Sequence, residues 1–317
     1  MTGGAGFIGS HLAEQLVSYG ADVTVVDNFL TGHRENLEGI DVILIDADVS
    51  QPAEQYLPDG YTPDVVLHFA SPASPPKYQK HRIATYSVNS FGTHHLLQYL
   101  LKYAPQARFL FASTSEVYGD PLVHPQAEDY WGNVNPNGAR SFYDEAKRLG
   151  ETICGVHHGL GIDTRIVRIF NTYGPRIDIE DGRVIPNLLS QAMTHQPLTI
   201  YGDGTQTRSY CYVSDLIEGI LRFASRDSLA GETVNLGNPE ERTILETAEV
   251  IQSLLRSEDP LPIEFHPLPK DDPLRRRPDI TKAKQLLDWE PKVPFHEGLL
   301  KTVEYFRRKN DSTAKTV

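Results

Sequence analysis

Tyr143 and Lys147 stand four residues apart in a segment that the sequence predicts to be helical. Side chains at this spacing lie on one face of a helix. An ammonium group beside a phenol favours the phenolate and lowers a phenol pKa that starts near ~10. The pair therefore predicts that Tyr143 is a general base near neutral pH, with its pKa lowered by Lys147. Such a pair on its own is a weak signal, so its surroundings decide its meaning.

A cluster of Ser, Thr and Glu residues lies upstream of this pair, within residues 112–119. It follows residues 107–111, an apolar run that is typical of a buried parallel strand. Open α/β sheets bind their ligands at the carboxyl ends of the strands, so we expect Thr114 and Glu116 beside a ligand. We expect Thr114 and Tyr143 to share a hydrogen bond with the same substrate hydroxyl.

Three glycines, Gly3, Gly6 and Gly9, have the spacing of a dinucleotide-binding turn. The first permits the tight turn, the second lets the backbone approach a pyrophosphate, and the third allows close helix packing. The pyrophosphate is expected at the amino end of a helix predicted over residues 10–19. This motif normally follows a strand, and here the chain starts at the turn. We therefore expect the first strand of the sheet to be missing through truncation.

Asp27 ends the next predicted strand, about 20 residues beyond the glycines, where dinucleotide-binding proteins carry an acid. A carboxylate at this place accepts hydrogen bonds from ribose hydroxyls and repels a 2′-phosphate. Asp27 therefore predicts NAD rather than NADP as the cofactor.

The composition limits the classes of function. The chain has 317 residues, enough for one large α/β unit with a smaller second lobe, and a mean hydropathy of −0.37, as expected of a soluble protein. Its net charge of −12 argues against nucleic acid or a membrane as partner. Two cysteines suit a reducing compartment, so we expect a cytoplasmic protein. The neighbouring histidines at 94–95 and 157–158 point apart on a helix, so no metal site is expected.

Several segments together resemble the extended short-chain dehydrogenase/reductase family: residues 112–120, residues 128–136 and the Tyr143/Lys147 pair. Within this family, the chain is similar nearly end to end to the group that decarboxylates UDP-glucuronate to UDP-xylose. Residues 171–176 are typical of its nucleotide-sugar members. The resemblance implies an α/β fold: a doubly wound parallel Rossmann sheet with a smaller mixed α/β lobe that binds the substrate.

The resemblance also implies the roles of individual residues. The catalytic residues implied are Thr114, Glu116, Tyr143, Lys147 and Arg276, with Glu116 and Arg276 serving the decarboxylation. Because an arginine does not lose its proton, we expect Arg276 to act electrostatically and Glu116 to order a water for proton transfer. Those implied to bind NAD are Gly3, Gly6, Phe7, Ile8, Gly9, Asp27, Asn28, Phe29, Thr31, Gly32, Asp48, Val49, Phe69, Ser71, Ala112, Tyr143, Lys147 and Thr172. Those implied to bind the UDP-sugar are Ser74, Tyr78, Asn171, Arg183, Arg208 and Arg276. Residues 71–78 are rich in proline, so we expect a rigid loop that contacts the substrate and is not helical.

We expect residues 1–174 to form the NAD-binding domain, with residues 209–237 returning to it, and residues 175–317 to form the nucleotide-sugar lobe. The family resemblance implies a homodimer in which the helix of residues 86–103 and the Tyr143 helix form a four-helix bundle with the partner.

Three other functions remain open. A UDP-sugar 4-epimerase or a nucleotide-sugar 4,6-dehydratase would share the fold and the oxidation step. By the family pattern, the dehydratase carries Asp where this chain has Ser115. An NAD-binding regulatory module without activity is disfavoured because Thr114, Tyr143 and Lys147 are all present.

Overall fold

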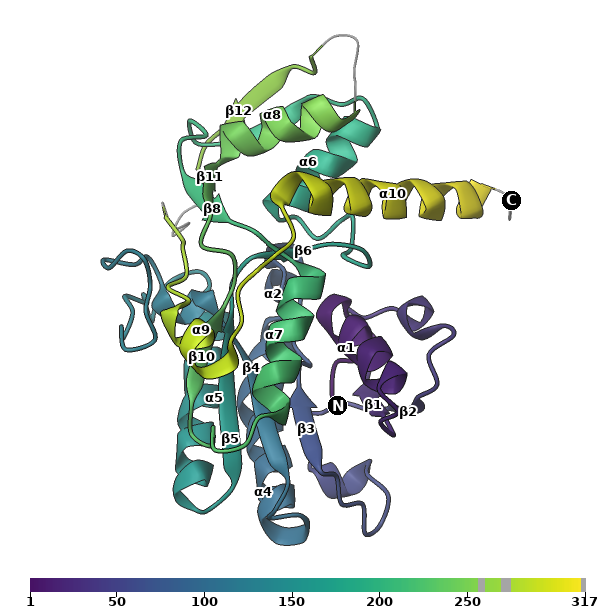
Figure 1. The fold of residues 1–317 in the computed structure, drawn as a ribbon, viewed down its shortest axis with the longest axis vertical. Coiled ribbons are helices and arrows are strands. Elements are labelled where there is room, and N and C mark those ends of the chain that lie inside the picture. Colours follow the sequence, from purple (N-terminus) through teal and green to yellow (C-terminus); the bar gives the residue numbers. More distant parts are fainter. Residues whose placement is uncertain (256–259, 269–274, 315–317) are drawn as a thin grey trace.

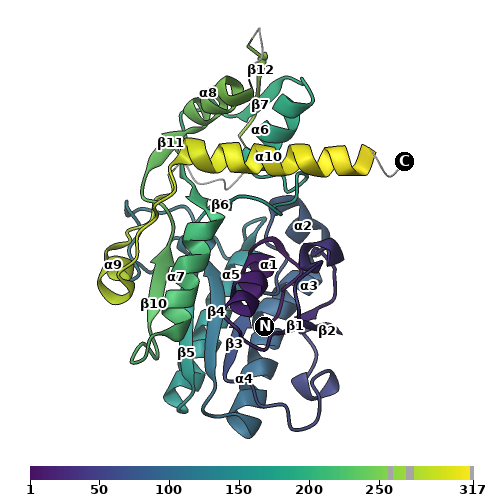
Figure 2. The same cartoon turned by 45° about the vertical axis from the view of Figure 1, so that its right-hand side comes forward.

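The structure is a computed structural model that describes residues 1–255, 260–268 and 275–314. A body built around a parallel sheet carries a second lobe at one end (Figure 1). Helix α10 (Phe295–Ala314) crosses the molecule beneath α6 (Val184–Met193) and α8 (Ile244–Leu255) in both views (Figures 1 and 2).

The strands of the body lie parallel in the spatial order β2, β1, β3, β4, β5, β10. Their bounds are β1 (Thr24–Asp27), β2 (Ile43–Asp46), β3 (Val65–His68), β4 (Arg108–Thr114), β5 (Asp163–Ile169) and β10 (Thr233–Leu236). β4 is central and carries Phe109, Leu110 and Phe111, which are fully buried, as a strand covered on both faces requires. The doubly wound parallel sheet is confirmed.

Thr2 lies between β1 and β3 and is the join between the two halves of this sheet. It bridges Val26 on one side and His68 on the other. The Thr2 amide donates to Leu67 O at 2.9 Å, and the Gly3 amide donates to Val26 O at 2.9 Å. Among the described residues, Thr2 and Gly3 alone make these contacts between β1 and β3.

Helices cover both faces of the sheet (Figures 1 and 2). One face carries α1 (Phe7–Ser18) and α7 (Val213–Ser225), which pack against each other. The opposite face carries α3 (Arg82–Ser87), the π-helical turn η3 (Val88–Gly92), α4 (Thr93–Tyr103) and α5 (Ser141–Gly159). Three short 3-10 turns complete the body: η1 (Arg34–Leu37), η2 (Ala53–Gln55) and η4 (Ser115–Tyr118).

The prediction that the proline-rich segment cannot be helical is wrong. Helix α2 spans Pro75–Lys80, with Ser74 at its amino cap. Pro75 and Pro76 occupy its first two positions, where a helix uses no backbone N–H and the fixed φ of proline favours the helical turn.

The second lobe is mixed α/β. β7 (Leu198–Tyr201) pairs in parallel with β12 (Ile263–His266), and β8 (Thr207–Ser209) pairs antiparallel with β11 (Glu241–Thr243). A capping box precedes α8: the Glu246 amide donates to Thr243 Oγ1 at 3.0 Å, and the Thr243 amide donates to Glu246 Oε2 at 2.8 Å. β6 (Thr172–Tyr173) and β9 (Cys211–Tyr212) pair between the lobes, and α9 (Thr281–Leu287) packs against β10 and α7.

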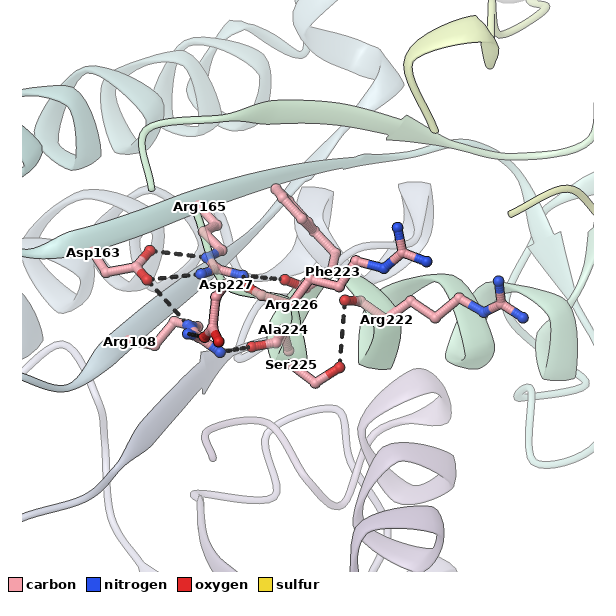
Figure 3. A network of polar contacts seen from close by, with 9 residues as sticks. All are labelled: Arg108, Asp163, Arg165, Arg222, Phe223, Ala224, Ser225, Arg226 and Asp227. Carbon is pink, nitrogen blue, oxygen red and sulfur yellow. Dashed lines mark hydrogen bonds and ion pairs between the residues drawn. The ribbon is translucent and has the colours of Figure 1, made fainter. Parts of the chain in front are cut away.

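Two arginines fix the carboxyl end of α7 to the amino ends of β4 and β5 (Figure 3). Arg165 is fully buried, and its guanidinium donates to Arg226 O at 2.6 Å and to both oxygens of Asp163. Arg108 donates to Asp163 Oδ2 at 3.0 Å and to Ala224 O at 2.5 Å. Cations at this end of a helix offset the dipole and satisfy its free carbonyls, so the contacts hold α7 on the sheet.

Candidate active site

A cavity of about 600 Å³ lies where the carboxyl ends of the strands meet the second lobe. It is the size of a small-molecule site. Its wall includes the predicted catalytic residues Thr114, Glu116, Tyr143, Lys147 and Arg276. The same wall carries the predicted cofactor residues Gly3, Gly6, Phe7, Ile8, Gly9, Thr31, Phe69, Ser71, Ala112 and Thr172, and the predicted substrate residues Ser74, Tyr78, Asn171, Arg183 and Arg208.

The glycine turn leaves room for a ligand at one of its three glycines. Gly3 has φ +71°, and a Cβ there would lie 2.5 Å from Ala70 N. A Cβ at Gly9 would collide with Gly3 O. At Gly6, a Cβ would meet only Gly3 O, at 3.3 Å, so this glycine keeps space free in front of the amino end of α1. That space fits a pyrophosphate, which backbone N–H groups at a helix amino end bind well.

Asp27 is buried at the end of β1 and is fixed there by two backbone donors. The Ala5 amide donates to Oδ2 and the Phe29 amide donates to Oδ1, both at 2.9 Å. Burial raises the pKa of the Asp27 carboxyl, and these two hydrogen bonds oppose the rise. The carboxylate thus lies beside the glycine turn, in the relation to the pyrophosphate site that ribose binding requires.

A smaller pocket of about 40 Å³ lies next to the main cavity. Its wall includes the predicted cofactor residues Asn28, Thr31, Asp48, Val49 and Ser71. Asp27, Phe29 and Gly32 line neither pocket. Gly32 instead packs on the glycine turn, and a Cβ added to it would lie 3.0 Å from Ala5. The Arg34 guanidinium lies 3.8 Å from the centroid of the Phe29 ring. The residues present therefore fit a dinucleotide that runs from the glycine turn to this pocket.

Tyr143 and Lys147 project from the first half of α5 toward the end of β4. Both are buried, at 4% exposure each. Lys147 Nζ donates to Ala112 O at 2.6 Å, and the Tyr143 phenol shares a hydrogen bond with the Thr114 side chain. The spacing of four residues thus brings both groups to the same strand end, as predicted.

The expected lowering of the Tyr143 pKa by Lys147 is wrong for this structure. Burial raises the pKa of the Tyr143 phenol above its ordinary value. The hydrogen bond with Thr114 lowers this pKa but does not cancel the rise. Burial also lowers the pKa of Lys147 to about 7, against an opposing effect of Glu151. The sequence predicted the proximity of the two groups, but their pKa values depend on desolvation, which spacing does not reveal.

Glu116 lies between two arginines at the same cavity wall. Its carboxylate contacts the guanidinium of Arg276 on one oxygen and that of Arg140 on the other. Arg276 is 4% exposed and also donates to Gly119 O at 3.2 Å. Arg140 lies 3.7 Å from Asp144 as well, which places two acids and two bases in one cluster.

Besides Asp144, the sequence analysis missed Arg140 in this cluster. It stands three residues before Tyr143 and lines the cavity. An isolated arginine ahead of a helix reads as a surface charge, so the only available signal was its closeness to the Tyr143 helix. Its partner Glu116 is far away in the sequence, and only the fold brings the two together.

The predicted substrate residues surround the remaining wall. Arg183 Nη2 donates to Asp181 Oδ2 at 2.8 Å, and Arg208 Nη1 donates to Thr207 O at 2.8 Å. The Tyr78 ring stacks on that of Tyr143. Planar guanidinium groups suit a diphosphate, so this end of the cavity fits the anionic part of a nucleotide-sugar.

A Rossmann-type sheet in which a glycine turn and a Tyr/Lys pair share one cavity defines the class of short-chain dehydrogenases/reductases. The chain belongs to the NAD dependent epimerase/dehydratase family, whose model matches residues 1–237. NAD is accordingly its cofactor.

Known proteins resemble the chain over its whole length. It is 50% identical to UDP-glucuronic acid decarboxylase 1 of Danio rerio, covering 99% of this chain and 73% of that protein. It is 49% identical to UDP-glucuronic acid decarboxylase 4 of Arabidopsis thaliana, covering 98% and 68%. Among solved structures, UDP-glucose 4-epimerase from Thermotoga maritima has a TM-score of 0.86 at 29% identity, with 98% of each chain covered. The dTDP-glucose 4,6-dehydratase DesIV from Streptomyces venezuelae, solved with NAD bound, has a TM-score of 0.86 at 28% identity, covering 98% and 97%.

Proposed function

We propose that this protein converts UDP-glucuronate to UDP-xylose and carbon dioxide. The observation that carries the proposal is the Glu116 carboxylate held between Arg276 and Arg140 at the wall that also carries Thr114 and Tyr143. Relatives at about half identity over nearly the full chain are UDP-glucuronic acid decarboxylases.

The first step is an oxidation at C4 of the sugar. NAD supplies the chemistry by taking a hydride from C4 and giving it back later. Tyr143 accepts the proton of the C4 hydroxyl, and Thr114 holds that hydroxyl in place. Since burial raises the pKa of the Tyr143 phenol, a positive charge in the cavity must lower it before the phenol can act as a base. Bound NAD would supply such a charge through its nicotinamide ring, whereas Lys147 holds the strand end through its hydrogen bond to Ala112 O.

The ketone at C4 is β to the C6 carboxylate, so the bond between C5 and C6 can break without a metal or a Schiff base. Its electron pair moves into the enolate of the C4 ketone while carbon dioxide leaves. Arg276 stays charged and orients the carboxylate, since an arginine does not lose its proton. A water held by Glu116 then protonates C5. Tyr143 finally returns its proton to the oxygen at C4, and the overall reaction consumes one proton and is redox neutral.

The same proposal includes the division into lobes. Residues 1–174 with 209–237 form the NAD-binding domain, and the pairing of β10 with β5 supports that return. Residues 175–317 contribute the nucleotide-sugar lobe, except that the packing of α9 against β10 favours placing α9 with the sheet.

We also infer a homodimer through α3–α4 and α5. Large apolar side chains are exposed along these helices: Ile83 at 71%, Phe91 at 54% and Val156 at 57%. An apolar stripe of this kind suits a helix bundle with a second copy. Sedimentation should show a dimer, and Phe91→Glu should shift it to a monomer; a wild-type monomer would contradict the dimer.

Both cysteines are buried free thiols, which fits a reducing compartment, and we propose the cytoplasm. Within the part of the chain that the structure describes, no helix is both long and apolar enough to cross a membrane. Fractionation of cells that express the native chain tests the location.

Purified protein mixed with UDP-glucuronate and followed by NMR tests the function. UDP-xylose with carbon dioxide supports the proposal. Formation of UDP-galacturonate would instead identify a 4-epimerase. Conversion of a nucleotide-hexose to a 4-keto-6-deoxy sugar would identify a dehydratase, and NAD binding without any turnover would identify a regulatory module.

Tyr143→Phe should lower the rate by about 10³-fold, because it removes the base. Tyr103→Phe, which changes a phenol on the far helix α4, is the matched control and should leave the rate unchanged.

A further inference from the structure

Glu151 is a largely buried acid that the proposed mechanism does not use. It lies one helical turn after Lys147 on α5, and its side chain is 14% exposed. Its carboxylate accepts three hydrogen bonds: from Ser113 Oγ at 2.5 Å, from Arg168 Nε at 3.0 Å and from Arg168 Nη2 at 2.8 Å. One side chain thus connects helix α5 with strands β4 and β5.

The contact with Ser113 reaches the catalytic end of β4. Ser113 stands between Ala112, whose carbonyl accepts from Lys147 Nζ, and Thr114, which bonds to Tyr143. Glu151 therefore fixes the same strand segment that Lys147 and Tyr143 contact, from one turn further along their own helix. A shift of α5 along β4 would break all three contacts together.

The contact with Arg168 extends the connection to the turn that carries Glu116. Arg168 Nη1 donates to Tyr118 Oη and to Glu128 O, both at 2.9 Å. Tyr118 is the last residue of η4 (Ser115–Tyr118), and its hydroxyl donates to Asn235 Oδ1 at 2.8 Å. Glu116 lies in this turn. Hydrogen bonds therefore connect Glu151 both to the end of β4 that carries Thr114 and, through Arg168 and Tyr118, to the turn that carries Glu116.

Glu151 is also the nearby acid that offsets the cost of burying Lys147. Burial lowers the pKa of the Lys147 ammonium to about 7, and the negative charge of Glu151 raises it. The other groups that face Lys147 are Cys154 on α5, His68 on β3, and the Ala112 carbonyl and Phe111 ring on β4. His68 is buried with a pKa lowered to about 3, so it stays neutral, and the buried Cys154 thiol has a raised pKa. Glu151 is thus the one carboxylate among these described neighbours.

We propose that Glu151 is a positioning residue that holds β4 in register with α5 and supplies a negative charge one helical turn from Lys147, so that Thr114, Tyr143 and Lys147 meet the cofactor and substrate together. The inference rests on the proposed function for its catalytic consequence. Its electrostatic part concerns this chain's own lysine and can be measured without turnover.

The experiment compares Glu151→Gln with Glu145→Gln across pH 6 to 9. Glu151→Gln keeps a side chain of the same shape and removes the charge, leaving Arg168 as an unpaired cation nearby. Both changes favour the neutral lysine, so the pH above which activity falls should move down by about one unit, which is about tenfold at a fixed alkaline pH. Glu145 lies on the same helix, 42% exposed, and pairs with Arg148 at 3.5 Å, so its variant should keep the wild-type profile.

The dissociation constant of NAD, measured calorimetrically over the same pH range, gives the readout that does not need turnover. Glu151→Gln should bind NAD more weakly than the wild type at pH 8, where its Lys147 has lost its charge. Binding should recover toward pH 6, where Lys147 regains the charge. An equal loss at every pH, or a wild-type profile, would overturn the inference. If the wild type binds NAD with this pH dependence but makes no UDP-xylose, the proposed function fails while the role of Glu151 stands.

Two more variants separate the electrostatic part from the contact part. Ser113→Ala removes one hydrogen bond and no charge, so kcat should fall several-fold while the pH profile stays in place. Adding Arg168→Gln to Glu151→Gln removes the unpaired cation, so the alkaline limb should move partly back. If Glu151→Gln does not fold, the double variant is compared with the wild type instead. Its alkaline limb should still lie below that of the wild type, and a limb at the wild-type pH would contradict the inference.

Discussion

The rings of Tyr78 and Tyr143 stack with their centroids 4.9 Å apart and their planes 16° apart. Tyr78 lies on α2, two residues after the second of the two prolines that begin that helix, and it is 3% exposed. The stack therefore connects the segment predicted to contact the sugar with the predicted base. It restricts how the phenol of Tyr143 can tilt.

We expect Tyr78→Ala to lower kcat by about tenfold with a smaller effect on NAD binding, because an aromatic pair contributes about 1 kcal/mol beyond its buried area. Tyr78→Phe should keep most of the activity: burial raises the pKa of the Tyr78 phenol to about 12, so the hydroxyl is not a base near neutral pH. Steady-state rates with UDP-glucuronate measure both. Tyr103→Ala removes a ring that contacts Tyr99 away from the cavity and serves as the control. Equal rates for Tyr78→Ala and the wild type would refute the role of the stack.

Thr114→Val should shift the activity profile to higher pH. The hydrogen bond with Thr114 lowers the pKa of the Tyr143 phenol, so its loss raises that pKa further and leaves less phenolate at any given pH. The rate at pH 7 should therefore drop, by about tenfold for each unit of the shift, and the acidic limb of the profile, where Tyr143 is still a neutral phenol, should move to higher pH. The rate against pH between 6 and 10 measures the shift.

Thr114→Ser is the matched control for this variant. Thr114 Oγ1 also accepts from the Glu116 amide at 3.2 Å as the cap of η4, and serine keeps both hydrogen bonds. Valine loses the cap as well, at about 1 kcal/mol of stability, which a melting curve records separately from the profile. A uniform loss of rate at all pH values would mean that only the cap matters.

The parts of the fold that follow local rules could be predicted from the sequence. The apolar run ending at Phe111, the glycine spacing and the Thr243/Glu246 cap each depend on residues close together in the chain, and each is present. The helical start at Pro75 was predicted wrongly, although the rule for proline at the first helical turn was available.

The electrostatics of the site could not be predicted in the same way. The two arginines on Glu116 come from positions 140 and 276, and only the fold brings them to one carboxylate. The pKa directions of Tyr143 and Lys147 depend on how much water the fold excludes. The spacing in the sequence predicted which groups lie close together. Their pKa values depend on burial, which the spacing does not reveal.

Arg140→Gln should weaken UDP-glucuronate turnover more than it weakens nucleotide binding. It leaves the Glu116 carboxylate with Arg276 as its cation and removes one positive charge from the wall where we place the sugar carboxylate. A charged hydrogen bond in such a site contributes about 2 kcal/mol, so kcat/KM should fall about 30-fold. The affinity for UDP-glucose, which has the same nucleotide and no carboxylate, should change little.

Arg82→Gln is the control for that change, because Arg82 lies on α3 and donates to Gln79 O at an exposed position. The comparison needs initial rates with UDP-glucuronate and calorimetry with UDP-glucose for both variants. If Arg140→Gln weakens the two ligands equally, Arg140 does not discriminate the carboxylate, and its contact with Glu116 serves only to hold the wall together.

Asp163→Asn should destabilise the fold far from the cavity. Burial opposes the charged form of Asp163, but hydrogen bonds from Arg165 and Arg108 outweigh it and bring the pKa of the carboxyl below its ordinary value (Figure 3). A folded-state pKa below the unfolded one stabilises the protein above the unfolded pKa, and this contribution is lost as the pH falls through the folded pKa. At pH 7 the substitution leaves the fully buried Arg165 without its acid, and we expect a loss of about 3 kcal/mol of unfolding free energy.

Asp227→Asn tests whether this loss reflects burial rather than the number of ion pairs. Asp227 is 93% exposed and contacts the same Arg108 at 3.1 Å, and such a surface pair contributes about 0–1 kcal/mol. Urea unfolding at pH 7 should therefore separate the two variants by about 2 kcal/mol or more, and the gap should narrow as the pH is lowered below 4, where the wild-type carboxylate becomes protonated. Equal midpoints for the two variants at pH 7 would show that the Arg108 and Arg165 contacts do not hold α7 on the sheet.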